Sequence, residues 1–586
     1  MAENKQVTLT IDGKDVKVSD DTTIMQAAES IGIRIPRLCY HPDLSIEGSC
    51  RVCIVEVEGS KFYISSCSTK VTNGMKVKTN SPEIRQARRD IVELILDNHP
   101  KECQTCERDG RCELQNLAYD LGVRERLFEG KRKEFPIENS SVSIVRDAEK
   151  CILCGRCIRV CEEVQGICNL SQHHRGFHTE VTPAYGAKMD ESVCIQCGQC
   201  INACPTAALQ EKRHTDQVWA ALNDPTKHVV VQTAPSIRAA IGEDFGFPPG
   251  TPCTGKMVTA LRKLGFDAIF DTDFAADLTI MEEAHELKLR LEKNERLPLI
   301  TSCSPGWVNF MEKFYPELIP HASSCRSPMQ MMSAMIKTYY AKQINKDPKD
   351  IYVVAVMPCV AKKFEMERPE HYLDGIKLTD AVLTTREVDW MIKSYGIDFV
   401  NLKDSEFDNP LGESTGAGVI FGTTGGVLEA ALRTAIVELT GKKPEDIEIK
   451  DVRAVEGLRE RELKVGDMTL NVAVSNGLVN AKTILDKVVS KEKQFHVIEV
   501  MACPGGCIGG GGQPYPPKGY KILDPKLFAK RAEALYSIDK GKKLRMSHEN
   551  PSIIKLYKEF LKEPGSDVAH KLLHTNYHQR FPKGIR

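Results

Sequence analysis

The sequence predicts a multidomain protein in which small cysteine-rich α+β modules precede one large α/β domain. Three observations support this prediction. The chain has 586 residues, which exceeds the size of a single ordinary core. Most of its 22 cysteines fall in tight clusters that end at residue 204. After residue 225, β-branched runs such as HVVVQ and IYVVAV alternate with longer helical patterns, which is typical of an α/β domain.

Charge and composition narrow the possible partners. Lys and Arg total 79 against 80 Asp and Glu, so the net charge of −1 gives no electrostatic basis for binding nucleic acid. No apolar run reaches the length of a membrane-spanning helix, and the start MAENKQVTLT lacks the pattern of a signal peptide. We therefore expect no membrane insertion and a cytoplasmic location. Clustered cysteines in such a protein indicate metal ligation rather than disulfides.

Residues 1–80 are predicted to form the first module. VTLTIDGKDVKV alternates apolar and polar residues around Asp12-Gly13, which predicts a β-hairpin, and SDDTTIMQAAESIGI follows as a capped helix. The combination resembles the β-grasp fold of plant-type ferredoxins, although the first cysteine gap departs from their spacing. The resemblance implies a [2Fe–2S] cluster on four cysteines: Cys39, Cys50, Cys53 and Cys67.

Residues 81–123 carry the second cluster of candidate ligands. A charged amphipathic helix is predicted over 82–98, and His99, Cys103, Cys106 and Cys112 follow it. Three thiolates need a fourth group, so we expect His99 to complete a [4Fe–4S] site with one histidine and three cysteine ligands. The alternative is that His99 only caps the helix before Pro100.

Residues 141–215 contain two copies of C-x2-C-x2-C-x3-C, at 151–161 and 194–204. In such runs the fourth cysteine ligates the other cluster, so the pattern predicts two [4Fe–4S] clusters. The first set is Cys151, Cys154, Cys157 and Cys204, and the second is Cys194, Cys197, Cys200 and Cys161. Zinc is the alternative, but zinc sites rarely show two matched four-cysteine runs. The four N-terminal clusters are predicted to form an electron relay.

The α/β domain is expected over 225–545, followed by a helical segment over 546–586 that is expected to wrap the outside. Three motifs follow predicted buried strands: TSCSPGW (301–307), MPCVAKKFE (357–365) and VMACPGGC (500–507). Ligands gather at the carboxyl ends of strands in such sheets. The motifs therefore predict one further four-cysteine site, formed by Cys303, Cys359, Cys503 and Cys507.

These motifs resemble the signature loops of the [FeFe]-hydrogenase catalytic domain, and the resemblance extends over essentially the whole chain. It implies a two-lobed α/β domain that holds an H-cluster. This group is a [4Fe–4S] cubane joined through one cysteine sulfur to a two-iron unit with CO, cyanide and azadithiolate. By the resemblance, Cys359 and Cys503 hold the cubane, and Cys507 holds the cubane and bridges to the two-iron unit.

The resemblance also implies the surroundings of the two-iron unit. Lys362 would donate to one cyanide, with Pro235 and Ser236 around the other. Met357, Phe421 and Met501 would form the walls. Without the resemblance, the Met and Phe residues would be ordinary core residues and Lys362 a surface lysine.

A proton route is the next implied feature. In TIMEEAHELKLR, Glu283, Glu286 and Arg290 share one helix face. With Ser323 they match the family's proton relay. On spacing alone, a solvated helix face would be the better interpretation.

Cys303 has two possible roles. The usual family loop reads TSCCP, in which the first cysteine shuttles protons and the second ligates the cubane, whereas Ser304 stands at the second position here. Either Cys303 is the fourth cubane thiolate, or it shuttles protons and the cubane has an oxygen or open ligand. Cys168, Cys253 and Cys325 have no assigned role and are predicted to be packing residues.

The expected function is reversible hydrogen oxidation and proton reduction. The form of the TSCSPGW loop resembles the multi-subunit group, which implies a flavin- and NAD(P)-binding diaphorase subunit and a small [2Fe–2S] subunit as partners. Ferredoxin, with electron bifurcation, is a further possible partner. The alternatives are a stand-alone ferredoxin-dependent hydrogenase, a hydrogen sensor, and an electron-transfer subunit like that of respiratory complex I.

Overall fold

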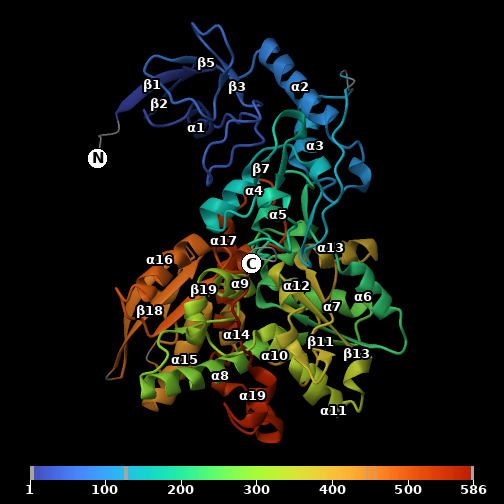
Figure 1. The fold of residues 1–586 in the computed structure, drawn as a ribbon, viewed down its shortest axis with the longest axis vertical. Coiled ribbons are helices and arrows are strands. Elements are labelled where there is room, and N and C mark those ends of the chain that lie inside the picture. The colour runs from blue at the N-terminus through green and yellow to red at the C-terminus, as the bar shows by residue number, and fades with distance from the viewer. Residues whose placement is uncertain are drawn as a thin grey trace.

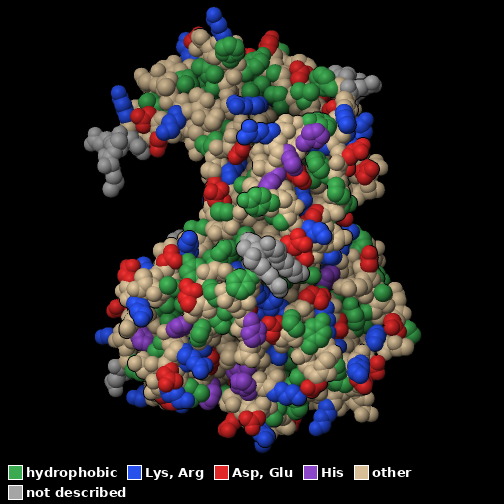
Figure 2. Space-filling model, viewed as in Figure 1, with side chains coloured by type: hydrophobic (Ala, Val, Ile, Leu, Met, Phe, Trp, Pro, Cys, Tyr) green, Lys and Arg blue, Asp and Glu red, His purple; other side chains and the backbone are tan. Residues whose placement is uncertain are grey.

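The computed structural model describes residues 5–124, 128, 130–444, 446–455, 457–466 and 468–581. The outermost residues of the predicted first and last segments, 1–4 and 582–586, lie outside this range. A narrow cysteine-rich part stands on a broad α/β body (Figure 1). Within the described residues, no helix has both the length and the apolar character needed to cross a bilayer. Acidic and basic side chains are interspersed over the face in Figure 2, as the near-zero net charge leads one to expect.

The first module has the predicted hairpin and helix. β1 (Gln6–Ile11) pairs antiparallel with β2 (Lys14–Ser19) around the predicted turn. A capping box between Thr23 and Gln26 begins α1 (Ile24–Ser30). The five-stranded sheet has the order β2-β1-β5-β3-β4, completed by β3 (Ile54–Val57), β4 (Ile64–Ser65) and β5 (Lys76–Lys78).

Two short helices carry the internal repeat of the third module. Both α4 (Arg156–Arg159) and α5 (Gln199–Ala203) begin directly after a left-handed glycine, Gly155 at φ 68° and Gly198 at φ 75°. Glycine adopts this conformation without strain, so each cysteine run can turn sharply into its helix. The module's other elements are β6 (Ile144–Arg146), β7 (Ser171–His173), β8 (Glu180–Thr182) and β9 (Leu209–Glu211). Before it come α2 (Pro82–Asp97) and α3 (Glu113–Asp120).

The α/β body contains two separate four-stranded sheets, which confirms the two-lobed prediction. The first is parallel, in the order β11 (Ala268–Asp271), β10 (His228–Thr233), β13 (Ile351–Met357) and β16 (Ala381–Thr384). The second has the order β12 (Leu299–Ile300), β19 (Val497–Met501), β18 (Met468–Asn476) and β17 (Leu458–Val465), with β17 antiparallel.

Helices cover both sheets. α7 (Thr254–Leu264) and α13 (Thr385–Ser394) contact the first sheet, and α16 (Leu478–Val489) contacts the second. The long α8 (Thr272–Lys293) packs against α10 (Pro328–Met335), α14 (Gly416–Ile420) and α15 (Gly426–Thr440). Further helices are α6 (Thr215–Leu222), α9 (Pro305–Phe314), α11 (Ala341–Gln343) and α12 (Ala361–Glu365).

The C-terminal segment is helical, as predicted, and it is packed into the core. It contains α18 (Pro551–Leu556) and α19 (Asp567–Leu573), and α17 (Pro525–Gly541) precedes it in the predicted α/β domain. Leu556 and Leu573 belong to the same buried cluster as Met331 and Met335 of α10. The segment lies on the outside of the body, as expected, and its buried apolar face also forms part of the body's core.

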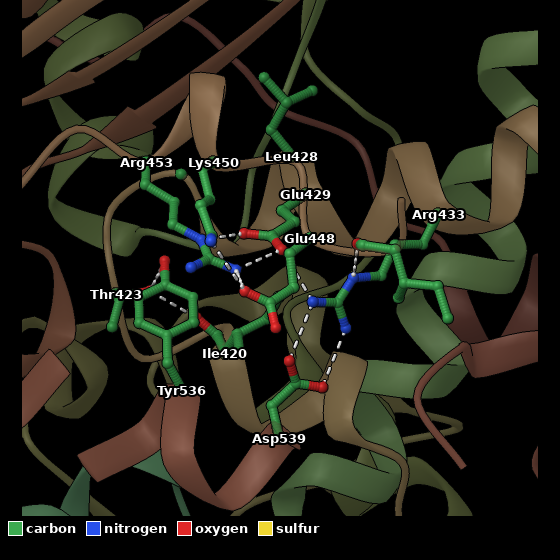
Figure 3. A network of polar contacts seen from close by, with 12 residues as sticks. Ile420, Thr423, Leu428, Glu429, Arg433, Glu448, Lys450, Arg453, Tyr536 and Asp539 are labelled. Atoms are coloured by element: carbon green, nitrogen blue, oxygen red, sulfur yellow. Dashed lines mark hydrogen bonds and ion pairs between the residues drawn. The ribbon is translucent and has the colours of Figure 1, made fainter. Parts of the chain in front are cut away.

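A buried ion network fastens α17 to α15 (Figure 3). The Arg433 guanidinium is fully buried and lies 2.7 Å from Glu429 and 2.9 Å from Asp539. Arg453 donates to the same Glu429 at 2.8 Å. Because each buried charge has partners, the network holds the two helices together without leaving an uncompensated ion.

Candidate functional site

Three strand ends meet at one cavity of about 80 Å³ in the α/β body. The TSCSPGW loop follows β12, the MPCVAKKFE loop follows β13 and the ACPGGC loop follows β19. The cavity is lined by the four cysteines that the motifs predict to converge: Cys303, Cys359, Cys503 and Cys507. The sequence separates these loops by up to about two hundred residues, and the two sheets bring them together.

Burial determines the chemistry of these thiols. It raises the pKa of Cys503 to about 11 and the pKa values of Cys359 and Cys507 to about 12. Burial also raises the pKa of Cys303 well above its ordinary value, with the charge of Glu283 as the next cause. A metal supplies the positive charge that deprotonates such thiols. The donor set therefore fits an iron–sulfur group.

The residues predicted to surround the two-iron unit line the cavity, with the exception of Ser236. Pro235, Met357, Phe421 and Met501 all line the cavity. Ser236 stands behind the lining, where its hydroxyl donates to the Cys507 carbonyl at 3.5 Å.

The buried side-chain amide of Gln513 holds Ser236 in place. Gln513 Nε2 donates to the Ser236 hydroxyl at 3.2 Å and to the Cys507 carbonyl at 3.2 Å. Sequence reasoning missed Gln513, because nothing in its local sequence relates it to residue 236.

Lys362 brings a positive charge to the cavity wall. Its ammonium group donates to the Cys303 carbonyl at 3.3 Å and pairs with Glu365 at 2.7 Å. The residue is only 8% exposed. Sequence reasoning also missed Glu365, although it ends the MPCVAKKFE motif and lies one helical turn after Lys362.

The glycine run after Cys503 lets backbones approach closely. A Cβ atom on Gly506 would lie 2.8 Å from the Thr424 nitrogen, and one on Gly510 would lie 2.2 Å from the Pro358 oxygen. Side chains at these positions would force the loops apart. The run therefore holds the cysteine loops together.

Behind the cavity lies a series of buried oxygens on α8 and the 323–324 loop. Burial raises the pKa of Glu283 to about 7, opposed by a hydrogen bond from Ser323. Ser323 Oγ also donates to Glu286 at 3.4 Å, and Arg290 donates to Glu286 at 2.6 Å. The structure thus brings together Glu283, Ser323 and Glu286, with Cys303 at one end.

Glu499 is a second buried carboxyl near the cavity that sequence reasoning missed. It accepts the backbone N–H groups of Gly425 and Leu428 at 2.6 and 2.7 Å. Burial raises its pKa to about 7. These contacts fix the loop between α14 and α15. In the sequence, the indication of such a buried carboxyl is the Glu within the apolar run VIEV.

The β-grasp cysteines converge at one end of the first module. The Cys39 amide donates to Cys50 Sγ at 3.5 Å, and Ser65 Oγ lies 3.3 Å from Cys53 Sγ and 3.5 Å from Cys67 Sγ. Hydrogen bonds from Cys50 and then Cys67 lower the pKa of Cys39. The four thiols are close enough to share one small cluster.

Two further small cavities contain the next predicted ligand sets. One of about 20 Å³ is lined by His99, Cys103, Cys106 and Cys112. One of about 30 Å³ is lined by Cys151, Cys154, Cys157 and Cys204. The second set includes the fourth cysteine of the other run, as the crossed assignment predicts.

The remaining ferredoxin-type set lies beside the central cavity. Burial raises the pKa of Cys200 well above its ordinary value, followed by the charges of Cys197, Cys194 and Cys161. Cys197 also lines the central cavity together with Cys503. The set therefore adjoins the predicted H-cluster site.

Two arginines connect neighbouring cysteine sites. Arg159 donates to the carbonyls of Cys39 at 2.7 Å and Cys154 at 3.1 Å. Arg108, which lines the cavity that contains His99, donates to the carbonyls of Cys204 and Thr206. Both N-terminal sites thus adjoin the site of the 151–157 cysteines, which gives a branched arrangement.

Family models match successive parts of the chain. Residues 227–511 match the C-terminal domain of the iron-only hydrogenase large subunit, and 525–580 match the iron hydrogenase small subunit. Upstream, 4–82 match a 2Fe-2S iron-sulfur cluster binding domain, 88–126 the NADH-ubiquinone oxidoreductase-G iron-sulfur binding region, and 143–208 a 4Fe-4S dicluster domain.

Known proteins resemble the chain over nearly its full length. The NADP-reducing hydrogenase subunit HndD of Solidesulfovibrio fructosivorans is 49% identical over 98% of this chain and 99% of its own. Iron hydrogenase 1 of Clostridium pasteurianum is 44% identical over 97% and 99%. A solved [FeFe]-hydrogenase HydA1 structure from Chlamydomonas reinhardtii is 42% identical, with a TM-score of 0.56, over 63% of this chain and 99% of its own.

Proposed function

The chain belongs to the iron-only ([FeFe]) hydrogenase large-subunit family and is an iron hydrogenase, and we propose that its H-cluster occupies the cavity between the two sheets. The observation that carries this proposal is the convergence of four cysteines, from three loops, on that cavity. When bound, the H-cluster supplies the chemistry that interconverts dihydrogen with two protons and two electrons. Cys359 and Cys503 would hold the cubane, and Cys507 would hold it and bridge to the two-iron unit.

The cavity wall would orient the two-iron unit. Lys362 would present its ammonium group to a cyanide ligand, and the Glu365 carboxylate holds that ammonium group in place. Met357, Phe421 and Met501 would exclude water, because their side chains offer no hydrogen bonds. A dry surrounding strengthens the interaction of each remaining charge.

Protons would travel from Cys303 through Glu283 and Ser323 to Glu286. Two observations support this order: Glu283 raises the pKa of Cys303, and Ser323 contacts both carboxyls. A carboxyl with a pKa of about 7 can accept and release a proton at neutral pH at small cost.

The same geometry favours the proton-shuttle role for Cys303. Its side chain packs with Phe421 and Met501, which would flank the two-iron unit. Ser304 also lines the cavity, and its Oγ accepts the Ala502 amide at 3.2 Å. Ser304 would then provide the fourth, oxygen ligand of the cubane.

Electrons would follow one [2Fe–2S] and three [4Fe–4S] clusters. The β-grasp site and the His99 site would be two entrances that meet at the 151–157 site, and Cys197 would bring the last cluster next to the H-cluster. Two entrances suit two electron partners.

Those partners would be a flavin- and NAD(P)-binding diaphorase subunit and a small [2Fe–2S] subunit in the cytoplasm, with ferredoxin as a possible bifurcating partner. The relative named as an NADP-reducing hydrogenase subunit supports this assignment. The relative named iron hydrogenase 1 favours the second candidate, a stand-alone ferredoxin-dependent enzyme. Co-purification decides: a single 65.3 kDa chain that is fully active with ferredoxin would overturn the complex.

Infrared spectroscopy tests the H-cluster proposal directly. Matured protein should show CO and cyanide stretching bands together with hydrogen evolution. If these bands are absent after maturation, in protein that retains its N-terminal iron, the proposal that the cavity holds an H-cluster is refuted.

A further inference from the structure

The C-terminal segment places a histidine against the far end of the proposed proton relay. His574 directly follows α19, which packs against α10 at the base of the body (Figure 1). The Thr575 amide donates to the Ser324 carbonyl at 2.8 Å, and the Arg326 amide donates to the Leu573 carbonyl at 2.7 Å. These backbone bonds fix His574 next to the loop that carries Ser323.

A continuous series of hydrogen bonds joins His574 to Glu286. Ser324 Oγ lies 3.1 Å from Glu286 Oε2 and 2.8 Å from His574 Nδ1. On the other side of the ring, His574 Nε2 lies 3.0 Å from Glu282 Oε2. Glu282 is itself held by the Tyr557 hydroxyl at 2.5 Å and the Gly565 amide at 2.9 Å.

Arg290, the other partner of Glu286, is a poor outlet for protons. Its guanidinium group donates to Glu286 and to the carbonyls of Arg296, His321 and Ala322, so its donors are occupied. Guanidinium has no acceptor and does not lose its proton in proteins. A proton that reaches Glu286 therefore needs a group that can accept it.

We propose that His574 is a proton-transfer residue that gives the relay a second exit through Ser324. A protonated Glu286 passes its proton to Ser324 Oγ while the serine hydroxyl proton moves to His574 Nδ1. Glutamate and imidazolium result, so protons and charge balance. Glu282 accepts the Nε2–H bond throughout, which fixes the tautomer and acts as the positioning group.

The exit ends at the surface of α19. His574 retains 8% exposure, and the exposed His570 ring stacks on it at 4.8 Å with an interplanar angle of 6°. The proton thus leaves a buried carboxylate through one serine and one imidazole. In the opposite direction, the same groups supply protons for hydrogen evolution.

The test uses the matured full chain with the variants His574→Gln and His574→Ala. Glu286 is 16% exposed and can exchange some protons directly, so we expect turnover to fall about tenfold, less than the ~100-fold or more typical of a lost acid–base group. The solvent deuterium isotope effect should rise, while iron content and infrared bands stay unchanged. Added imidazole should restore much of the rate of His574→Ala.

The matched control is His548→Gln. Like His574, His548 is a C-terminal histidine bound to a hydroxyl, with Nδ1 at 3.2 Å from Thr434, but it is half-buried and lies outside the series. Control and wild type should turn over equally. Full turnover of His574→Gln with an unchanged isotope effect overturns the proposal, and so does a loss in His574→Ala that imidazole does not reverse.

The inference rests on the proposed relay, and a further variant separates the two. Glu283→Gln interrupts the relay before it branches, so it should be nearly inactive whichever exit operates. If Glu283→Gln is inactive and His574→Gln is fully active, only the second exit is wrong. A fully active Glu283→Gln contradicts the relay itself.

Discussion

Glu283→Gln tests both the chemistry and the energetics of the buried carboxyl. Burial raises the pKa of Glu283 from 4.5 to about 7. Each tenfold change in ionisation corresponds to about 1.4 kcal/mol, so keeping this carboxylate charged costs the folded protein about 3 kcal/mol. Glutamine has the same shape and cannot ionise. The variant should therefore lose activity and gain stability.

The sign of the pH dependence follows from linkage. A carboxyl whose pKa is raised on folding contributes stability below its unfolded pKa, and that contribution is lost as pH rises through the folded value. The advantage of Glu283→Gln over wild type should therefore grow from about 2 kcal/mol at pH 6 to about 3 kcal/mol at pH 8. The melting temperature of cluster-loaded Glu283→Gln should exceed that of cluster-loaded wild type by about 2 °C for each kcal/mol of this advantage.

The assay pairs these melting curves with hydrogen evolution. Turnover should fall at least ~100-fold, and the inflection of the wild-type pH–rate profile near 7 should disappear. Glu292→Gln, an exposed position on the same helix, should change neither quantity. If Glu283→Gln turns over like wild type, the relay is refuted. If the difference in melting temperature between Glu283→Gln and wild type is the same at pH 6 and pH 8, the raised pKa of Glu283 is refuted.

Three other predictions test separate parts of the molecule. Cys303→Ala should retain the cubane's electron paramagnetic resonance signal and lose turnover, whereas Ser304→Cys should shift that signal; loss of the cubane in Cys303→Ala would make Cys303 the ligand. Lys362→Met should leave the cubane iron in place and remove the CO and cyanide infrared bands, because the two-iron unit loses its charged anchor; retained bands would contradict this role. Arg433→Met should lower stability by about 3 kcal/mol because it removes a fully buried cation that pairs with two buried carboxylates, which leaves Glu429 with Arg453 alone and Asp539 with Arg545 alone, while Arg262→Met at an exposed ion pair should cost under ~1 kcal/mol; equal melting temperatures would refute the difference.

The cysteine sets could be predicted because local spacing encodes them. In the run 151–161, Cys151, Cys154 and Cys157 line one cavity, so three ligands of that set are adjacent in sequence as well as in space, and the repeat itself points to Cys204 as the fourth. The strand-end motifs were predictable for a different reason, since parallel strands bring their carboxyl ends to one edge. The apolar runs at residues 299, 351 and 497 indicate those strands directly.

Supporting residues could not be predicted, because their partners lie far away in the sequence. Gln513 contacts Ser236, and His574 contacts Ser324, across 277 and 250 residues. Neither residue stands in a motif or a periodic pattern. The glycine run after Cys507 places Gln513, and the packing of the C-terminal helices against the body places His574.

Cys303 shows where sequence and structure contribute different parts of one answer. The motif assigns position 303 to the active centre, but the demand for four thiolates and the register of the loop give opposite roles. Packing favours the proton-shuttle role over the ligand role, because the Cys303 side chain packs against the buried cluster that contains Phe421 and Met501. After burial, the charge of Glu283 also raises the pKa of Cys303. A thiol that adjoins both a buried acid and the proposed two-iron pocket is placed to move protons between them. On the proposed assignment, the cubane would depend on an oxygen from Ser304, a weaker partner for iron than thiolate, and Ser304→Cys should change the potential of the cubane.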